Sequence, residues 1–157
     1  MPTLNGFENI PMNNSYRKKI KIGATRAQVY QAIATKRGLA GWWTHLVEGA
    51  PSKEGKFTVR FEGMDQRIDL KVDHLLRPAV VEWTCVRHSA FPEWRGTRML
   101  FRLTEKSPGS CELLFSQEGL TPQLGCYEEI KNAWGYFLRS LSAYVESGRG
   151  TPFRKIS

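Results

Sequence analysis

The sequence has no long apolar run, and no segment approaches the roughly 20 consecutive apolar residues that a membrane-spanning helix needs. Its N-terminal stretch, MPTLNGFENIPMNNSY, also lacks the basic start and the apolar centre of a secretion signal. We therefore expect a soluble, cytoplasmic protein without integral membrane association, in which residues 1–15 form an irregular arm.

Cysteine and histidine are scarce. Cys85, Cys111 and Cys126 are an odd number of cysteines without Cys-x-x-Cys spacing, which argues against a disulfide framework and against a zinc site. The three histidines are scattered, with no ligand spacing between them. We expect no metal and no cofactor.

No catalytic signature is present either. The sequence lacks a GxSxG elbow, a P-loop and a GxGxxG turn, and Cys126 has no histidine near it to make it a nucleophile. The one pair of adjacent carboxylates, Glu128 and Glu129, falls on a predicted helix, where at most one of them can face inward. We therefore assign no catalytic residue.

Negative charge is in the minority, because 23 Lys and Arg residues outnumber 15 Asp and Glu residues and give a net charge of +8. Such an excess raises nucleic acid or an acidic membrane surface as a partner. Outward positions of the predicted strands nevertheless mix both signs, which is typical of a solvated face with cross-strand pairs. These positions are Arg17, Lys19, Lys21, Lys56, Arg60, Glu62, Asp69, Lys71, Asp73, Glu82, Arg98, Arg102 and Glu112. We expect no nucleic-acid partner.

What the sequence does contain is a regular order of elements. RKKIKIG predicts a strand, ATRAQVYQAIAT a helix with Thr25 as its N-cap, and KRGLAGWW a second, shorter helix. Alternating segments then predict five successive strands: KFTVRFEG, RIDLKVDHLL, VVEWTCVRH, TRMLFRLTE and SCELLFSQEG.

The C-terminal part, TPQLGCYEEIKNAWGYFLRSLSAYVESG, predicts one long amphipathic helix that stops at Gly148. Its apolar stripe consists of Ile130, Trp134, Phe137, Leu138, Leu141, Tyr144 and Val145. This order of elements predicts an α+β fold in which the long helix covers the apolar face of the sheet. We expect one domain over residues 16–152, followed by a tail over 153–157.

Several segments carry a family resemblance, namely GLAGWW, VEWTC, FPEWRGTRMLFRL, LLFSQEGL and AWGYFLRSLSAYVESGRGTP. In this order they resemble the family homologous to the C-terminal domain of the activator of the ninety-kilodalton heat-shock chaperone's ATPase, within the START-like (SRPBCC, helix-grip) superfamily. The resemblance spans nearly all of residues 16–152. It implies a helix-grip fold, in which a curved antiparallel sheet of about six strands wraps around the C-terminal helix and leaves a deep cavity between them. It specifies activity poorly, since the superfamily hosts carriers, cyclases, hydrolases and co-chaperones.

The inward-facing residues agree with a cavity, because most of them are apolar or aromatic, as in small-molecule pockets. A solid core filled by the same side chains is the alternative. The ligand-binding candidates are Trp43, Phe57, Phe61, Leu70, Trp83, Arg87, Met99, Phe101, Phe115, Gln117, Tyr127 and Trp134. Among the polar side chains, Arg87, Gln117, Tyr127 and His74 are candidate anchors for a ligand carboxylate or carbonyl. Alternatively, Arg87 reaches water at the rim.

Trp42 and Trp43 are adjacent, and neighbouring side chains on a helix point about 100° apart. We expect one of them to pack beneath the sheet and the other to border the cavity. The resemblance favours Trp43 for the second place. The alternative is that both are structural.

Three functions remain open. The first is a binding module for a mostly apolar small molecule, lipid-like or aromatic, with a carboxylate or carbonyl as an optional polar end. The second, implied by the resemblance, is a co-chaperone-like interaction protein. Because the sequence shows a lone domain, without the separate docking domain of the eukaryotic activators, we favour the first. The third is a cyclase or hydrolase that uses the same pocket.

Overall fold

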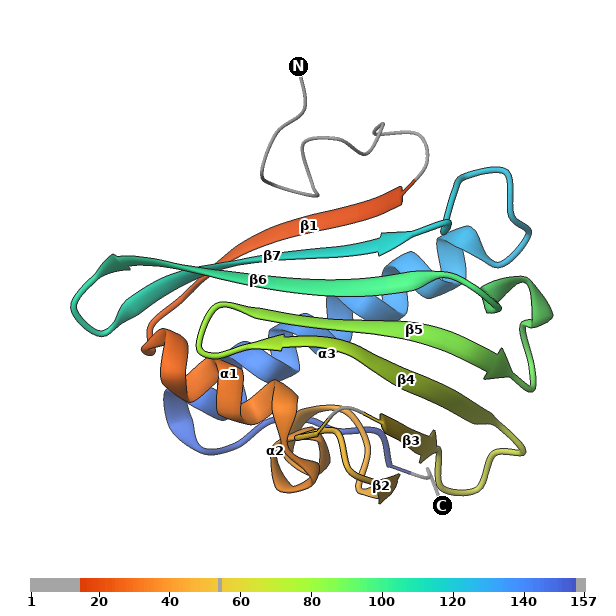
Figure 1. Ribbon diagram of the computed structural model, residues 1–157, viewed down its shortest axis with the longest axis horizontal. Coiled ribbons are helices and arrows are strands. Elements are labelled where there is room, and N and C mark those ends of the chain that lie inside the picture. Colours follow the sequence, from red (N-terminus) through yellow and green to blue (C-terminus); the bar gives the residue numbers. More distant parts are fainter. Residues whose placement is uncertain (1–14, 54, 155–157) are drawn as a thin grey trace.

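A curved sheet and one long helix that runs across one of its faces make up most of the molecule (Figure 1). The structure is a computed structural model and describes residues 15–53 and 55–154. Residues 1–14 of the predicted arm over 1–15 therefore lie outside the described residues, and Ser15 begins the first strand. The sheet has seven antiparallel strands in the order β1-β7-β6-β5-β4-β3-β2. The strands are β1 (Ser15–Ile22), β2 (Leu46–Gly49), β3 (Gly55–Arg60), β4 (Arg67–Leu76), β5 (Val80–His88), β6 (Arg98–Ser107) and β7 (Ser110–Glu118).

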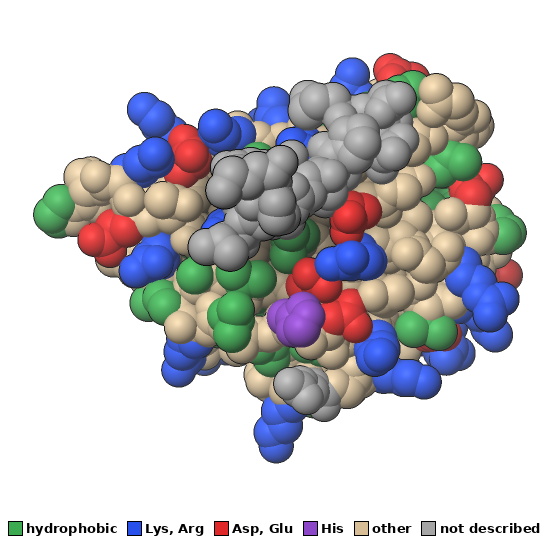
Figure 2. Space-filling model, turned by 45° about the horizontal axis from the view of Figure 1, so that its top comes forward, with side chains coloured by type: hydrophobic (Ala, Val, Ile, Leu, Met, Phe, Trp, Pro, Cys, Tyr) green, Lys and Arg blue, Asp and Glu red, His purple; other side chains and the backbone are tan. Residues whose placement is uncertain are grey.

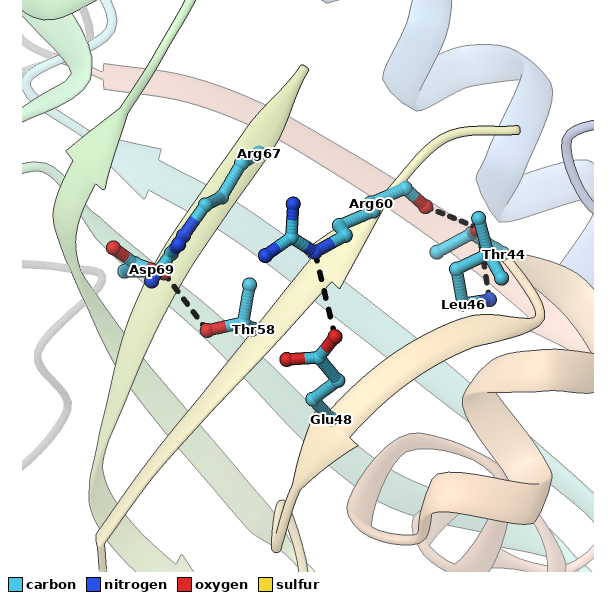
Figure 3. Close-up of polar contacts among 7 residues, drawn as sticks. All are labelled: Thr44, Leu46, Glu48, Thr58, Arg60, Arg67 and Asp69. Carbon is cyan, nitrogen blue, oxygen red and sulfur yellow. Dashed lines mark hydrogen bonds and ion pairs between the residues drawn. The ribbon is translucent and has the colours of Figure 1, made fainter. Parts of the chain in front are cut away.

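The α+β class and the helix-grip arrangement are confirmed, with one strand more than predicted. The additional strand, β2, has four residues, of which Val47 alone is buried, so it shows no alternation that the sequence could reveal. It pairs with β3 at the edge of the sheet. Thr44 fixes its start, because the Thr44 hydroxyl donates to the Arg60 carbonyl (2.6 Å) and accepts from the Leu46 N–H (3.3 Å) (Figure 3).

The two short helices, α1 (Arg26–Ala34) and α2 (Lys36–Trp42), begin where hydroxyl side chains cap them. As predicted, Thr25 is the N-cap of α1: its Oγ1 accepts from the Gln28 N–H (3.1 Å), while Gln28 Oε1 accepts from the Thr25 N–H (2.8 Å). The corner between the helices is tight, because a Cβ on Gly38 would collide with the Ala32 carbonyl.

The long helix α3 (Tyr127–Ser147) ends at Gly148, whose left-handed backbone (φ 85°) lets its N–H bond to the Tyr144 carbonyl (2.8 Å). Ile130, Trp134, Leu138, Ser140 and Leu141 are its buried residues, while Phe137, Tyr144 and Val145 of the predicted stripe are half-buried. Ser140 was not predicted to be buried. Its Oγ donates to the Trp42 carbonyl (2.8 Å) and accepts from the Thr151 N–H (2.6 Å), which ties α3 to α2 and to the C-terminal segment.

The face of the sheet away from α3 carries pairs of opposite charge, as the mixed outward positions predict. Arg67 Nε lies 2.9 Å from Asp69 Oδ1, which also accepts from the Thr58 hydroxyl (2.8 Å) (Figure 3). Arg98 lies between Glu82 (2.9 Å) and Glu118 (3.2 Å) on the neighbouring strands. Figure 2 shows basic side chains with acidic ones among them. The excess charge is therefore spread over the surface in view and not gathered into one stripe.

Candidate functional site

An apolar cleft of about 200 Å³ opens at one end of the molecule. The β3–β4 turn, the β5–β6 loop and the beginning of α3 meet there, at the right-hand end of the sheet in Figure 1. Its wall consists of Trp43, Phe61, Met64, Gln66, Ile68, His88, Phe91, Trp94, Glu129, Ile130, Ala133, Trp134, Phe137 and Phe153. Among the predicted ligand-binding residues, Trp43, Phe61 and Trp134 belong to this wall.

Most of the other predicted site residues fill a closed core. Phe57, Leu70, Trp83, Met99, Phe101 and Phe115 are all at most 2% exposed. Their rings pack edge-on or tilted, with centroids 4.9 Å apart for Trp83 and Phe101 and 5.0 Å apart for Phe101 and Phe115. The solid-core alternative therefore describes the centre of the domain, and the apolar cleft lies at one end of it.

The adjacent tryptophans have different surroundings, although both are buried. Trp42 donates from its indole Nε1 to the Ala32 carbonyl (2.9 Å), within the core beside α1. Trp43 lines the cleft and stacks nearly parallel to Trp42 and to Trp83, with both centroid distances 5.8 Å. The position of Trp43 agrees with the side that the family resemblance favours.

Arg87 is exposed and does not face inward together with Cys85. Strict alternation along β5 predicts that Cys85 and Arg87 face inward together. However, the pairing with β4 shifts register: Asp69 lies opposite Arg87, whereas the next residue, Leu70, lies opposite Cys85. Arg87 is consequently exposed, in agreement with the rim alternative, and His88 turns inward with 4% of its surface exposed. His74, on β4, is also exposed.

His88 is a polar residue of the cleft wall, together with Gln66 and Glu129, and sequence reasoning missed it. Its Nδ1 accepts from the backbone N–H groups of Ala90 and Phe91, both at 3.1 Å. Its ring packs against Trp94 (4.7 Å) and Phe91 (5.0 Å). Burial lowers the pKa of His88 to about 4, so the imidazole is neutral at pH 7. Because Nδ1 accepts, the proton of the neutral ring is on Nε2, which makes His88 an uncharged donor.

Gln117 and Tyr127 do not belong to the cleft wall. Gln117 is fully buried: its Oε1 accepts from Trp134 Nε1 (2.8 Å) and its Nε2 donates to the Thr97 hydroxyl (3.0 Å). Gln117 therefore holds the Trp134 ring in place from the core side of the cleft wall. Tyr127 is half-buried and meets the ring of Tyr16 edge-on at 6.5 Å.

Part of the wall comes from the predicted tail. The Phe153 N–H donates to the Trp43 carbonyl (2.8 Å), and the Phe153 ring lies edge-on to Phe61 at 5.4 Å. In the sequence, the signal for this contact is a single aromatic residue, Phe153, in a polar segment. Within residues 15–53 and 55–154 no cluster of His, Cys, Asp and Glu could hold a metal ion. None of the described helices is long and apolar enough to cross a membrane.

A family model described as Activator of Hsp90 ATPase homolog 1-like protein matches residues 23–146. The chain belongs to this family. The match confirms the resemblance seen in the sequence to the Aha1 C-terminal domain and its START-like superfamily. Comparison with curated protein sequences gives no match.

Solved structures of other proteins have the same fold. The Aha1 dimer from Colwellia psychrerythraea shares 28% identity at a TM-score of 0.71, over 87% of this chain and 98% of that one. SSP2350 from Staphylococcus saprophyticus shares 16% identity at a TM-score of 0.72, over 89% and 97%. CalU16 from Micromonospora echinospora shares 16% identity at a TM-score of 0.64, over 85% and 77%. At these identities, the last two are similar in fold alone.

Proposed function

We propose that this Aha1-like protein is a binding module that holds a small, mostly apolar molecule in the cleft. The observation that carries the proposal is an apolar, solvent-connected cleft of about 200 Å³ beside an otherwise filled core. An apolar cavity of about 150 Å³ accepts benzene, so this cleft has room for a ring-sized ligand. The volume favours an aromatic occupant over a long acyl chain.

The titratable groups around the cleft support binding more than catalysis. A histidine whose pKa is about 4 is a weak base at neutral pH, and efficient proton transfer needs a pKa near the working pH. Burial raises the pKa of Cys126, next to α3, which keeps its thiol protonated and unreactive. Cyclase-like or hydrolase-like chemistry in the same cleft is therefore the weaker proposal.

Chaperone regulation is the second candidate, and membership in the Aha1-like family favours it. In that case the protein would stimulate the ATPase of a heat-shock chaperone through its surface, independently of the cleft. A cytoplasmic location, which we also propose, suits both candidates.

Titration with prodan, an uncharged naphthyl ketone dye that is bright in apolar surroundings, tests the first candidate. We expect micromolar binding, equivalent to about −8 kcal/mol. Ala133→Phe should weaken it at least tenfold, because Ala133 lies in the wall and a ring there would fill the cleft. Asn132→Phe is the matched control, since Asn132 is the exposed neighbour on α3.

The result separates the two candidates. If prodan does not bind, or binds equally well to Ala133→Phe, the binding module is rejected. Stimulation of a chaperone ATPase that Ala133→Phe leaves unchanged would then support the interaction protein.

A further inference from the structure

Charged side chains are almost absent from the cleft wall. Glu129, in the first turn of α3, is the acidic member, and among the wall residues that the structure describes there is no Lys or Arg, although the chain carries a net charge of +8. A ligand carboxylate entering the cleft would lose its hydration without gaining a cationic partner, and it would approach Glu129. The wall therefore disfavours anions.

The two tryptophan rings of the wall do not form a good cation site. Cations bind over ring faces, where the quadrupole is negative. Trp43 and Trp134 are each 2% exposed, and protein rings pack against them: Trp42 and Trp83 against Trp43, and Phe115 against Trp134 at 4.4 Å. Since these contacts take up the faces of Trp43 and Trp134, mainly the edges of these two rings remain for a ligand. The positive edge of an aromatic ring attracts the face of another ring and repels a cation.

His88 adds a directional polar group to this apolar wall. Its Nδ1 is already engaged by the two loop N–H groups, which leaves the Nε2 proton as its donor. In residues 15–53 and 55–154, no group accepts a hydrogen bond from Nε2. A donor that has no protein acceptor is available to a ligand that supplies one. A neutral donor suits the oxygen of a ketone, quinone or ether.

Building on the proposed binding function, we propose that the cleft selects uncharged molecules of one or two aromatic rings that carry a carbonyl-type acceptor. His88 is the residue that recognises the acceptor through its Nε2–H. Glu129, together with the missing cations, rejects carboxylates of the same shape.

Four 2-substituted naphthalenes of similar size test this selection: acetonaphthone, ethylnaphthalene, naphthoate and naphthyltrimethylammonium. Quenching of tryptophan fluorescence reports binding, because Trp43 and Trp134 line the cleft. We expect acetonaphthone to bind about tenfold more tightly than ethylnaphthalene, as one added hydrogen bond predicts. Naphthoate and the ammonium compound should each bind at least tenfold more weakly than acetonaphthone.

Two variants test whether His88 and Glu129 cause this ligand selection. His88→Asn keeps an acceptor for the loop N–H groups and removes Nε2, so the tenfold preference for the ketone over ethylnaphthalene should vanish. Glu129→Gln should strengthen naphthoate binding several-fold relative to acetonaphthone binding. Naphthoate or the ammonium compound binding as tightly as the ketone to the wild-type protein would overturn this inference and leave the binding module standing. If none of the four binds, the proposed function fails and the inference with it.

Discussion

The two ends of the sheet are built from similar side chains but are filled differently. At the end where α1 and α2 pack, Trp42, Phe101 and Leu141 are fully buried. At the opposite end, where the β3–β4 turn and the β5–β6 loop lie in Figure 1, the side chains leave a cleft of about 200 Å³. Both ends are rich in aromatic residues. The difference is in the backbone: regular elements bring side chains into close packing at the first end, whereas loops border the second. Aromatic content alone therefore does not predict a cavity.

Replacing one phenylalanine at each end gives the largest expected contrast. Phe101→Ala should lower the free energy of unfolding by about 3–5 kcal/mol, because Phe101 is 0% exposed and four rings surround it. Phe137→Ala should cost about 1 kcal/mol, because Phe137 is half-buried in the cleft wall and its removal leaves space that water can enter. Urea denaturation measures both. Equal losses would show that the cleft end is packed as tightly as the other.

The elements at the filled end could be predicted from the sequence, because each has a local signal. Strands β3 and β4 bury every second residue over most of their length, so their side chains alternate, and Thr25 marks the start of α1 through its hydroxyl. The short β2 was missed, because one buried residue makes no pattern.

The cleft could not be predicted in the same way. One of its polar residues, His88, faces inward because β4 and β5 shift register near Cys85, and a period of two carries no information about such a shift. Phe91 and Trp94 reach the cleft from a loop, and Phe153 reaches it from the C-terminal segment. These contacts join residues far apart in the chain, so a single sequence has no local signal for them.

Acidification to about pH 4 should lower the free energy of unfolding by about 3 kcal/mol. Burial holds the pKa of His88 at about 4, below its ordinary value of 6.5. As the pH falls below 6.5, the unfolded chain binds a proton at His88 that the folded protein does not bind, so stability declines until about pH 4. Above pH 6.5 this contribution is constant. Urea denaturation at several pH values measures it.

His88→Asn is the control for this pH dependence, because asparagine does not titrate. Asp69 acts in a lower range: partial burial opposes ionisation, but hydrogen bonds from Arg67 and Thr58 hold its pKa below 3.8, so its contribution is lost only under more acidic conditions. If the wild-type and His88→Asn proteins lose stability in parallel between pH 6.5 and 4, His88 does not cause the decline.

Replacing Gln117, which supports the cleft wall from the core side, should have an intermediate effect on the free energy of unfolding. Gln117→Leu removes the acceptor of Trp134 Nε1 and leaves that buried N–H unpaired, whereas the Thr97 hydroxyl loses the Gln117 donor but still donates to the Trp94 carbonyl (2.6 Å). We expect a loss of about 1–3 kcal/mol. Prodan affinity should also fall, because Trp134 is no longer held in the wall. Loss of stability with unchanged affinity would mean that Gln117 supports the core and not the cleft.

The smallest effect on stability is expected at Phe153, which separates the wall of the cleft from the body of the domain. Phe153→Ala removes the ring that packs on Phe61 but keeps the N–H that donates to the Trp43 carbonyl, because that donor is in the main chain. The half-buried ring should contribute about 1 kcal/mol or less. Its loss widens the cleft, so prodan should dissociate several-fold faster in stopped-flow displacement. Arg154→Ala is the control, since Arg154 is exposed and lies outside the wall. Equal dissociation rates for wild type and Phe153→Ala would show that the ligand does not pass or touch this ring, and the site would then have to lie deeper, against Trp134 and Ile130.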